Sequence, residues 1–105
     1  PPFLGVPCSV KEAFEVEDMP MSVGHPARRA LTGRTDALAV QRLRRAGFIV
    51  LCVTNTSELC MWQESSNSVN GTTRNPYDAA RTVGGSSGGE ACVVAACGAR
   101  VGLGS

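Results

Sequence analysis

The apolar residues of this chain occur in short blocks separated by polar and glycine-rich stretches. Residues 3–10 combine apolar side chains with Gly and Pro, a pattern typical of a short strand that leads into a turn. Residues 17–35 are rich in Pro, Gly, Ser, Thr and charged residues and show no periodicity. We therefore predict a strand near the start of the chain, followed by a long surface connection.

The next segment predicts a helix and then a buried strand. Thr35 can cap a helix whose apolar residues fall on one side, and Gly47 can end it. The continuous apolar run 48–53 is typical of a strand in a parallel sheet that is covered on both faces. Because the order is strand, helix, strand, the sequence predicts an α/β architecture.

Further helix and strand signals follow in the second half. Ser57 can cap a short helix through Trp62, and residues 63–83 are mostly loop with Asn-Gly and Asn-Pro turn signals. Residues 90–97 predict a nearly all-apolar helix that a glycine ends, with Val101 beginning another strand. A helix that is apolar all round has to be buried, so we expect protein on every side of it.

The stretch 84–89, Gly-Gly-Ser-Ser-Gly-Gly, stands directly before that helix and is the main candidate for chemistry. Glycines let the backbone turn tightly, and a helix N-terminus offers unpaired N–H groups. A P-loop needs a lysine at its end, and no lysine follows this stretch. The dinucleotide fingerprint also fails, because Ser86 and Ser87 occupy the positions of its middle glycine.

Two interpretations involving a serine remain open. The stretch twice spells Gly-x-Ser-x-Gly, the nucleophile-elbow pattern, which needs an acid and a histidine later in the chain. The single histidine, His25, comes earlier, and we expect it to be an exposed polar residue. The other interpretation uses Lys11, the single lysine, which follows an apolar segment where burial can favour the neutral amine that accepts a proton from a serine.

Composition indicates a globular protein without an electrostatic surface for nucleic acid. The chain is 43% hydrophobic and 18% charged, with a formal net charge of +1, and its arginines are too few to form a nucleic-acid footprint. Five cysteines form no CxxC pair and fit no closed disulfide set, so we expect them to be reduced and mostly buried. No motif calls for a metal or a cofactor, and no apolar stretch approaches the roughly 20 residues of a membrane span.

Several motifs, in order along the chain, resemble the amidase signature family, and most closely its fatty-acid amide hydrolase type. They are Gly5-Val-Pro-Cys-Ser-Val-Lys-Glu12, Thr54-Asn55, Ser57-Glu-Leu-Cys-Met-Trp62, Glu64-Ser-Ser-Asn67, Asn75-Pro-Tyr-Asp78 and Gly84-Gly-Ser-Ser-Gly-Gly-Glu90. The resemblance runs over nearly the full chain. It implies an α/β/α fold with a mixed central sheet.

The resemblance also implies a Ser-Ser-Lys triad. Lys11 matches the base, and Ser86 matches the bridging serine, which the family holds in a cis peptide. The attacking serine of the family lies in an Asp-x-Gly-Gly-Ser stretch, which the family spacing puts beyond Ser105. Activity would then rise with pH, because a protonated Lys11 stops the relay.

Other positions are expected to bind substrate or support the loop. Ser87 is expected to hold the glycine loop by hydrogen bonding. Gly84 and Gly85 are expected to support the same loop through their backbone. Asn55 and Met61 are candidates for the substrate channel, although a core position is the default for Met61 and for the neighbouring tryptophan.

We therefore expect residues 1–105 to be the N-terminal part of an amidase signature domain, incomplete at both ends, inactive and poorly folded by itself. The whole protein is expected to be intracellular and to cleave lipophilic amides, including fatty-acid amides, and esters in addition. Membrane association through other segments and a homodimer stay open. The alternatives are a non-catalytic truncated scaffold and a glutamine-hydrolysing amidotransferase subunit.

Overall fold

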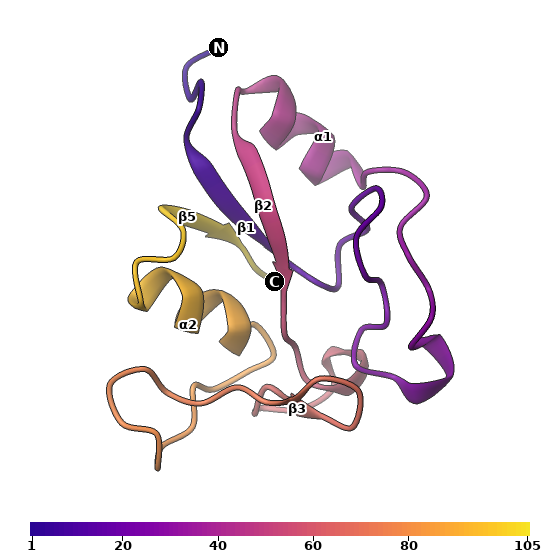
Figure 1. The fold of residues 1–105 in the computed structure, drawn as a ribbon, viewed down its shortest axis with the longest axis vertical. Helices are drawn as coiled ribbons and strands as arrows, with labels where there is room; N and C mark the ends of the chain where they lie inside the picture. The colour runs from indigo at the N-terminus through magenta and orange to yellow at the C-terminus, as the bar shows by residue number, and fades with distance from the viewer.

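The computed structural model describes residues 1–105 and is built around a small parallel sheet (Figure 1). Its three strands lie in the order β2-β1-β5, with β1 in the centre. The strands are β1 (Pro7–Lys11), β2 (Ile49–Thr54) and β5 (Val101–Leu103). Both pairings are parallel, so the carboxyl ends of all three strands meet at one edge.

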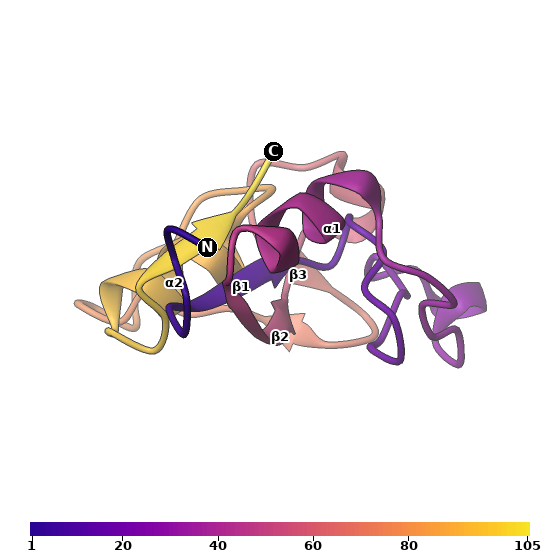
Figure 2. The same cartoon turned by 90° about the horizontal axis from the view of Figure 1, so that it is seen from above.

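Two helices cover opposite faces of this sheet. Helix α1 (Leu38–Arg45) precedes β2, and helix α2 (Gly88–Ala95) precedes β5. Successive side chains of a strand point to opposite faces. Val10 of β1 packs in one cluster with Val40 of α1, whereas Ser9 contacts the first turn of α2. The view from above in Figure 2 shows the two helices on different sides of the strands, which agrees with the predicted α/β class.

The start of α1 differs from the sequence prediction. The helix begins at Leu38 after Ala37, so Thr35 is not its cap. The neighbouring Asp36 carboxylate instead accepts hydrogen bonds from the Glu17 N–H at 2.9 Å and from Arg44 Nε at 2.7 Å. A tertiary contact, and not a local cap, therefore fixes the entry to the helix.

The predicted end of α1 is correct. Gly47 follows the helix with a φ of 101°, and a Cβ there would lie 2.7 Å from the Leu4 backbone nitrogen. Only glycine fits this left-handed turn without strain. Strand β2 then begins one residue later than expected.

Two segments predicted to be buried are partly open in this chain. In β2, Val50 is buried, but the alternate residues Ile49 and Leu51 are about half exposed. Helix α2 buries its first three residues, whereas Ala91 and Val94 lie on an exposed side. Within these 105 residues neither element is covered on all sides.

The loop region after β2 contains a small hairpin. Strands β3 (Ser66–Asn67) and β4 (Gly71–Thr72) pair antiparallel, and the Asn70-Gly71 signal lies at their turn. The short helix predicted from Ser57 is a 3-10 helix over Glu58–Cys60 and ends before Trp62. A second 3-10 helix, Pro26–Arg28, lies in the long connection between β1 and α1.

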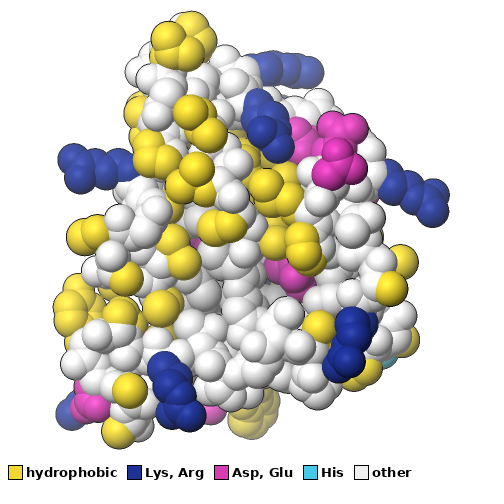
Figure 3. Space-filling view, in the orientation of Figure 1, with side chains coloured by type: hydrophobic (Ala, Val, Ile, Leu, Met, Phe, Trp, Pro, Cys, Tyr) yellow, Lys and Arg dark blue, Asp and Glu magenta, His cyan; other side chains and the backbone are white.

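The surface carries several large apolar side chains. Met61 is 81% exposed and Trp62 is 67% exposed, so the default expectation of a core position is wrong for both. Apolar side chains also reach the surface over the upper half of the face drawn in Figure 3, where Figure 1 places β1, β2 and α1. None of the helices is both long enough and apolar enough to cross a bilayer.

The cysteines are free, as predicted, but only one is buried. Cys8 lies in the core, Cys52, Cys60 and Cys92 are half-buried, and Cys97 is exposed. Cys97 has a φ of 60° directly after α2, and Gly98 donates its N–H back to Val93 O at 2.8 Å. This cysteine therefore occupies the left-handed position that ends the helix.

Candidate active site

Lys11 is the last residue of β1, and its side chain is fully buried. It projects from the same face of the strand as Ser9, toward α2. Its side-chain nitrogen, Nζ, lies 2.6 Å from Ser86 Oγ, 2.8 Å from Ser105 Oγ and 3.4 Å from the Ser105 carbonyl oxygen. The two residues that the sequence singled out are thus brought into direct contact across 75 positions of chain.

The glycine loop delivers Ser86 to Lys11 through an unusual backbone path. Gly84 has a φ of 77°, and the Gly85-Ser86 peptide bond is cis, as the family resemblance implies. A Cβ on Gly85 would lie 2.8 Å from the Gln63 carbonyl carbon. Both glycines are therefore needed for the shape and close packing of the loop, and they contribute no side chain to chemistry.

Ser65 holds the same loop from outside and was not among the predicted site residues. Its buried hydroxyl accepts from the Gly88 N–H at 2.7 Å and lies 3.1 Å from Gly84 O and 3.2 Å from Ser86 O. One hydroxyl thus contacts both ends of the turn that carries Ser86. A buried serine in a loop gives no periodic signal, so sequence analysis had only the Ser-Ser-Asn motif to indicate it.

Ser87 contacts the end of the segment that follows β5. Its Oγ accepts from the Ser105 N–H at 3.1 Å and lies 3.0 Å from the Ser105 carbonyl oxygen. Ser105, also missed by sequence analysis as a site residue, therefore contacts Lys11 through its hydroxyl and Ser87 through its backbone. Only the fold brings the segment after β5 back to the glycine loop.

Asn55 is engaged by the hairpin through both ends of its side-chain amide. Its Nδ2 lies 3.1 Å from Gly71 O and 3.0 Å from Thr73 Oγ1, and its Oδ1 accepts from Asn67 Nδ2 at 2.7 Å. Because both ends of the amide are occupied, the contacts of Asn55 are those of a residue that ties the end of β2 to β3 and β4.

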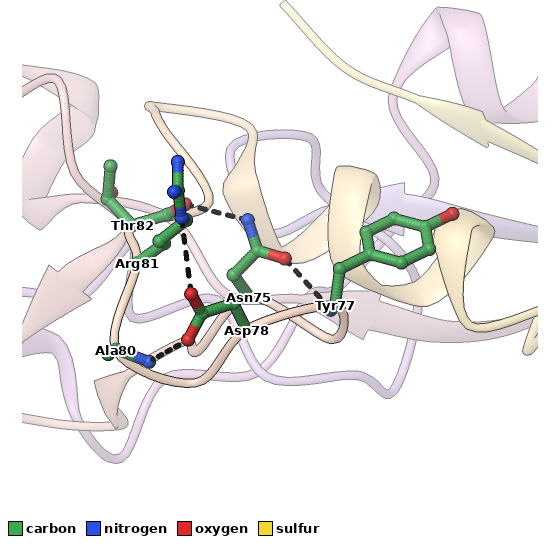
Figure 4. A network of polar contacts seen from close by, with 6 residues as sticks. All are labelled: Asn75, Tyr77, Asp78, Ala80, Arg81 and Thr82. Atoms are coloured by element: carbon green, nitrogen blue, oxygen red, sulfur yellow. Dashed lines mark hydrogen bonds and ion pairs between the residues drawn. The ribbon is translucent and has the colours of Figure 1, made fainter.

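The loop before the glycines is closed by its own polar groups, as Figure 4 shows. Asn75 accepts from the Tyr77 N–H at 2.9 Å and donates to Thr82 O at 3.0 Å. The Asp78 carboxylate accepts from the Ala80 N–H and from Arg81 Nε. The Thr82 hydroxyl then accepts from the N–H of the first loop glycine at 3.0 Å. The Asn-Pro-Tyr-Asp motif therefore fixes the entry to the glycine loop.

His25 and Met61 lie apart from this arrangement. His25 Nδ1 accepts from the Ala27 N–H, and its Nε2 lies 3.8 Å from Glu58 Oε1, so it does not pair with a serine of the glycine loop. The nucleophile-elbow interpretation therefore gains no support from His25. Met61 is solvent-exposed and makes no hydrogen bond through its side chain.

The surroundings of the Lys11–Ser86 pair are buried and polar but contain no ion pair to Lys11. Two carboxylates are also buried, Glu12 and Glu90. Glu12 accepts a hydrogen bond from the Ser22 hydroxyl at 2.7 Å, and Glu90 accepts from hydroxyl groups of the sheet.

The charge of Glu90 affects the pKa of two neighbouring thiols. Burial first, and the Glu90 carboxylate second, raise the pKa of the Cys8 and Cys52 thiols, so both stay protonated at neutral pH.

No cavity of this chain is lined by Lys11 or Ser86. The largest, about 440 Å³, lies beyond the C-terminal end of α2 and is lined by Pro7 and by residues 94 and 97–100. No cluster of His, Cys, Asp and Glu side chains in the structure has the arrangement of a metal site. The contact between Lys11 and Ser86 therefore lies outside the cavities that these 105 residues form by themselves.

Comparison with known proteins identifies the family of the chain. The Amidase family model matches residues 1–105. Human fatty-acid amide hydrolase 2 is 55% identical over 104 residues, which is 99% of this chain and 20% of that protein. A glutamyl-tRNA(Gln) amidotransferase subunit from Acidothermus cellulolyticus is 40% identical over 104 residues, which is 99% of this chain and 21% of that relative.

Among solved structures, the native peptide amidase of Stenotrophomonas maltophilia superposes with a TM-score of 0.89 at 35% identity, covering 95% of this chain and 21% of the peptide amidase. The chain belongs to the amidase family. It spans about a fifth of the length of the curated relatives that it matches.

Proposed function

We propose that the protein containing this chain is an amide hydrolase in which Lys11 and Ser86 form a proton relay. The observation that carries the proposal is the 2.6 Å contact between Lys11 Nζ and Ser86 Oγ, made by a fully buried lysine without a carboxylate partner. Burial disfavours the charged form of an amine, and a neutral amine can accept a proton. We also propose that residues 1–105 are the N-terminal part of an amidase domain.

In the proposed relay, neutral Lys11 accepts the Ser86 hydroxyl proton through its nitrogen lone pair. Ser86 takes a proton at the same time from the attacking serine, which lies outside these residues. The attacking oxygen forms a bond to the amide carbonyl carbon, and the tetrahedral intermediate then expels the amine. The protons return along the same relay to the leaving nitrogen, and water releases the acyl group by the same chemistry in reverse.

We propose supporting roles for the other predicted residues. Ser87 contacts Ser105 through two hydrogen-bond distances, and Asn55 is engaged on both sides of its amide. Both therefore act as loop supports, which keep the relay residues in register with the segment that follows β5. Met61, whose side chain is exposed, is available to contact a substrate or another part of the protein.

The proposed substrates are lipophilic amides such as fatty-acid amides. The support is the greater identity of the chain to human fatty-acid amide hydrolase 2, 55%, than to the glutamyl-tRNA(Gln) amidotransferase relative, 40%. Hydrolysis of glutamine is the second candidate, because the amidotransferase relative matches the chain over the same share of its length. Assays of the full-length protein with a long-chain amide and with glutamine, side by side, separate the two.

The relay is tested with Lys11→Ala and Ser86→Ala in the full-length protein. Removing a general base costs typically about 10²- to 10⁴-fold, so kcat/KM is expected to fall by at least about 10²-fold in each variant. Arg45→Ala and Ser68→Ala are matched controls, since both side chains are exposed and make no polar contact through their side chains. Amide hydrolysis that is unaffected by Lys11→Ala would contradict the proposal.

The wild-type protein supplies a further test. An absence of hydrolysis of any amide by the wild-type protein would favour the non-catalytic scaffold.

A further inference from the structure

A second buried charged group lies beside the relay and takes no part in the proposed proton transfer. Glu90 is only 6% exposed and stands in the first turn of α2, four residues after Ser86. None of the ion pairs of the chain includes it. A buried carboxylate costs free energy unless polar groups replace its hydration, so its surroundings need an explanation.

Both oxygens of this carboxylate are held by hydroxyl groups of the sheet. Ser9 Oγ donates to Glu90 Oε2 at 2.6 Å, and Thr54 Oγ1 donates to Glu90 Oε1 at 2.6 Å. Hydrogen bonds to a charged acceptor are the strong class, worth roughly twice a neutral one. The position in the first helical turn adds a favourable interaction with the helix dipole.

The two hydroxyl donors come from the positions that frame Lys11. Ser9 lies two residues before Lys11 on the same face of β1, and Thr54 is the residue of β2 in register with Lys11. The third strand also contacts the carboxylate, because a Cβ on Gly102 of β5 would overlap Glu90 Oε2. One side chain of α2 thus contacts all three strands close to the lysine.

We infer that Glu90 is a positioning residue, which holds the helix behind Ser86 against the strand that ends at Lys11 and so sets the Lys11–Ser86 distance. This inference rests on the proposed relay. Glu90 contacts neither Lys11 nor Ser86 by hydrogen bond, so it acts through the backbone on both sides. Loss of its carboxylate frees α2 to shift on the sheet, and small displacements of a catalytic group cost up to about 10²-fold in rate.

The test compares Glu90→Ala, Glu90→Gln and Glu90→Asp in the full-length protein. Activity is expressed per active site, titrated with a fluorophosphonate that reacts with the attacking serine, so that unfolded protein is not counted. Glu90→Ala is expected to lower kcat about 10- to 100-fold with KM changed less than about twofold, because the relay and not substrate binding is disturbed.

The conservative variants separate a geometric role from a role of charge. Glutamine keeps the length of the side chain, and the hydroxyl of Ser9 or Thr54 can rotate to accept from its amide, so Glu90→Gln should recover most of kcat. Aspartate keeps the charge but is one methylene shorter, so Glu90→Asp should behave like Glu90→Ala. Glu17→Ala is the control, because its exposed carboxylate makes no hydrogen bond.

Two further variants decide the question if Glu90→Ala does not fold. Thr54→Val and Ser9→Ala each remove one donor to the carboxylate, and each should lower kcat at nearly constant KM. A crystal structure of Thr54→Val should show Lys11 Nζ displaced from Ser86 Oγ. Variants of Thr54 and Ser9 that retain the wild-type kcat would overturn the positioning role.

Failure of this inference differs from failure of the proposed relay. If Lys11→Ala abolishes hydrolysis while Glu90→Ala keeps kcat within about twofold of wild type, the relay stands and the positioning role is wrong. If Lys11→Ala leaves hydrolysis unchanged, both are wrong. A loss in Glu90→Ala that appears in KM alone would assign the residue to substrate binding and also overturn the inference.

Discussion

Gly102 offers the most direct test of the packing around the candidate site. A methyl group at this position would overlap Glu90 Oε2 and would lie 3.0 Å from Glu90 Cδ and 3.1 Å from Ser9 Oγ. The φ of Gly102 is not left-handed, so Gly102→Ala perturbs the packing and not the backbone preference. Either the carboxylate leaves Ser9 or β5 moves away from β1.

Both routes have a cost that the structure allows us to bracket. Overpacking a filled site costs typically about 1–3 kcal/mol, and loss of a hydrogen bond to a charged group costs about 1.5–3 kcal/mol. We therefore expect Gly102→Ala to lower the free energy of unfolding by about 1–3 kcal/mol. The assay is urea unfolding of the full-length protein, followed by tryptophan fluorescence and by active-site titration in parallel.

Coupling to Glu90 makes the experiment specific. In a Glu90→Ala background the overlapping carboxylate is gone, so Gly102→Ala should add less than about half of its cost in the wild-type protein. Ser68→Ala is the control, because its side chain is exposed and makes no hydrogen bond. Additive effects of the two substitutions at Gly102 and Glu90 would refute the packing argument.

Two other predictions concern groups outside the relay. Partial burial opposes the ionisation of Asp36, but hydrogen bonds from the Glu17 N–H and from Arg44 hold the pKa of this carboxyl below its usual value. The ionised carboxylate therefore stabilises the fold at neutral pH, and this stabilisation is lost as pH falls through the acid range. Asp36→Asn should thus be less stable than wild type at pH 7, with the difference shrinking below about pH 4 in urea titrations; a constant difference would contradict this. Because burial raises the pKa of the Cys8 and Cys52 thiols, both should resist alkylation at pH 8 in the native protein and react after unfolding, as peptide mass spectrometry will show. Rapid native labelling of either thiol would count against the raised pKa.

The order of the main elements was predictable because each carries a local signal. The run 48–53 is apolar and β2 covers Ile49–Thr54; the periodic residues before it form α1, and Gly47 ends that helix. The start of α1 was not predictable, since Asp36 bonds to Glu17 and Arg44 rather than to the first turn. Local rules fail where a residue has a stronger partner far away in the sequence.

The candidate site was predictable only in part, for the same reason. The single lysine and the two adjacent serines flanked by glycines can be recognised from the sequence, and the family resemblance pairs Lys11 with Ser86. Ser65 and Glu90 stand in motifs of the sequence and Ser105 in none, and no role could be predicted for any of the three, because their contacts depend on the packing of loop, helix and strand.

The sequence by itself determined the α/β class, the flexible glycine turn and the chemical groups available, because these follow from side-chain chemistry and local backbone preference. The tertiary structure decided how those groups meet. It placed the end of β1 beside a loop 75 residues further along, and it buried the Glu90 carboxylate among hydroxyls of the sheet. Distances of 2.6 Å between residues so far apart depend on every element between them, and no local pattern encodes them.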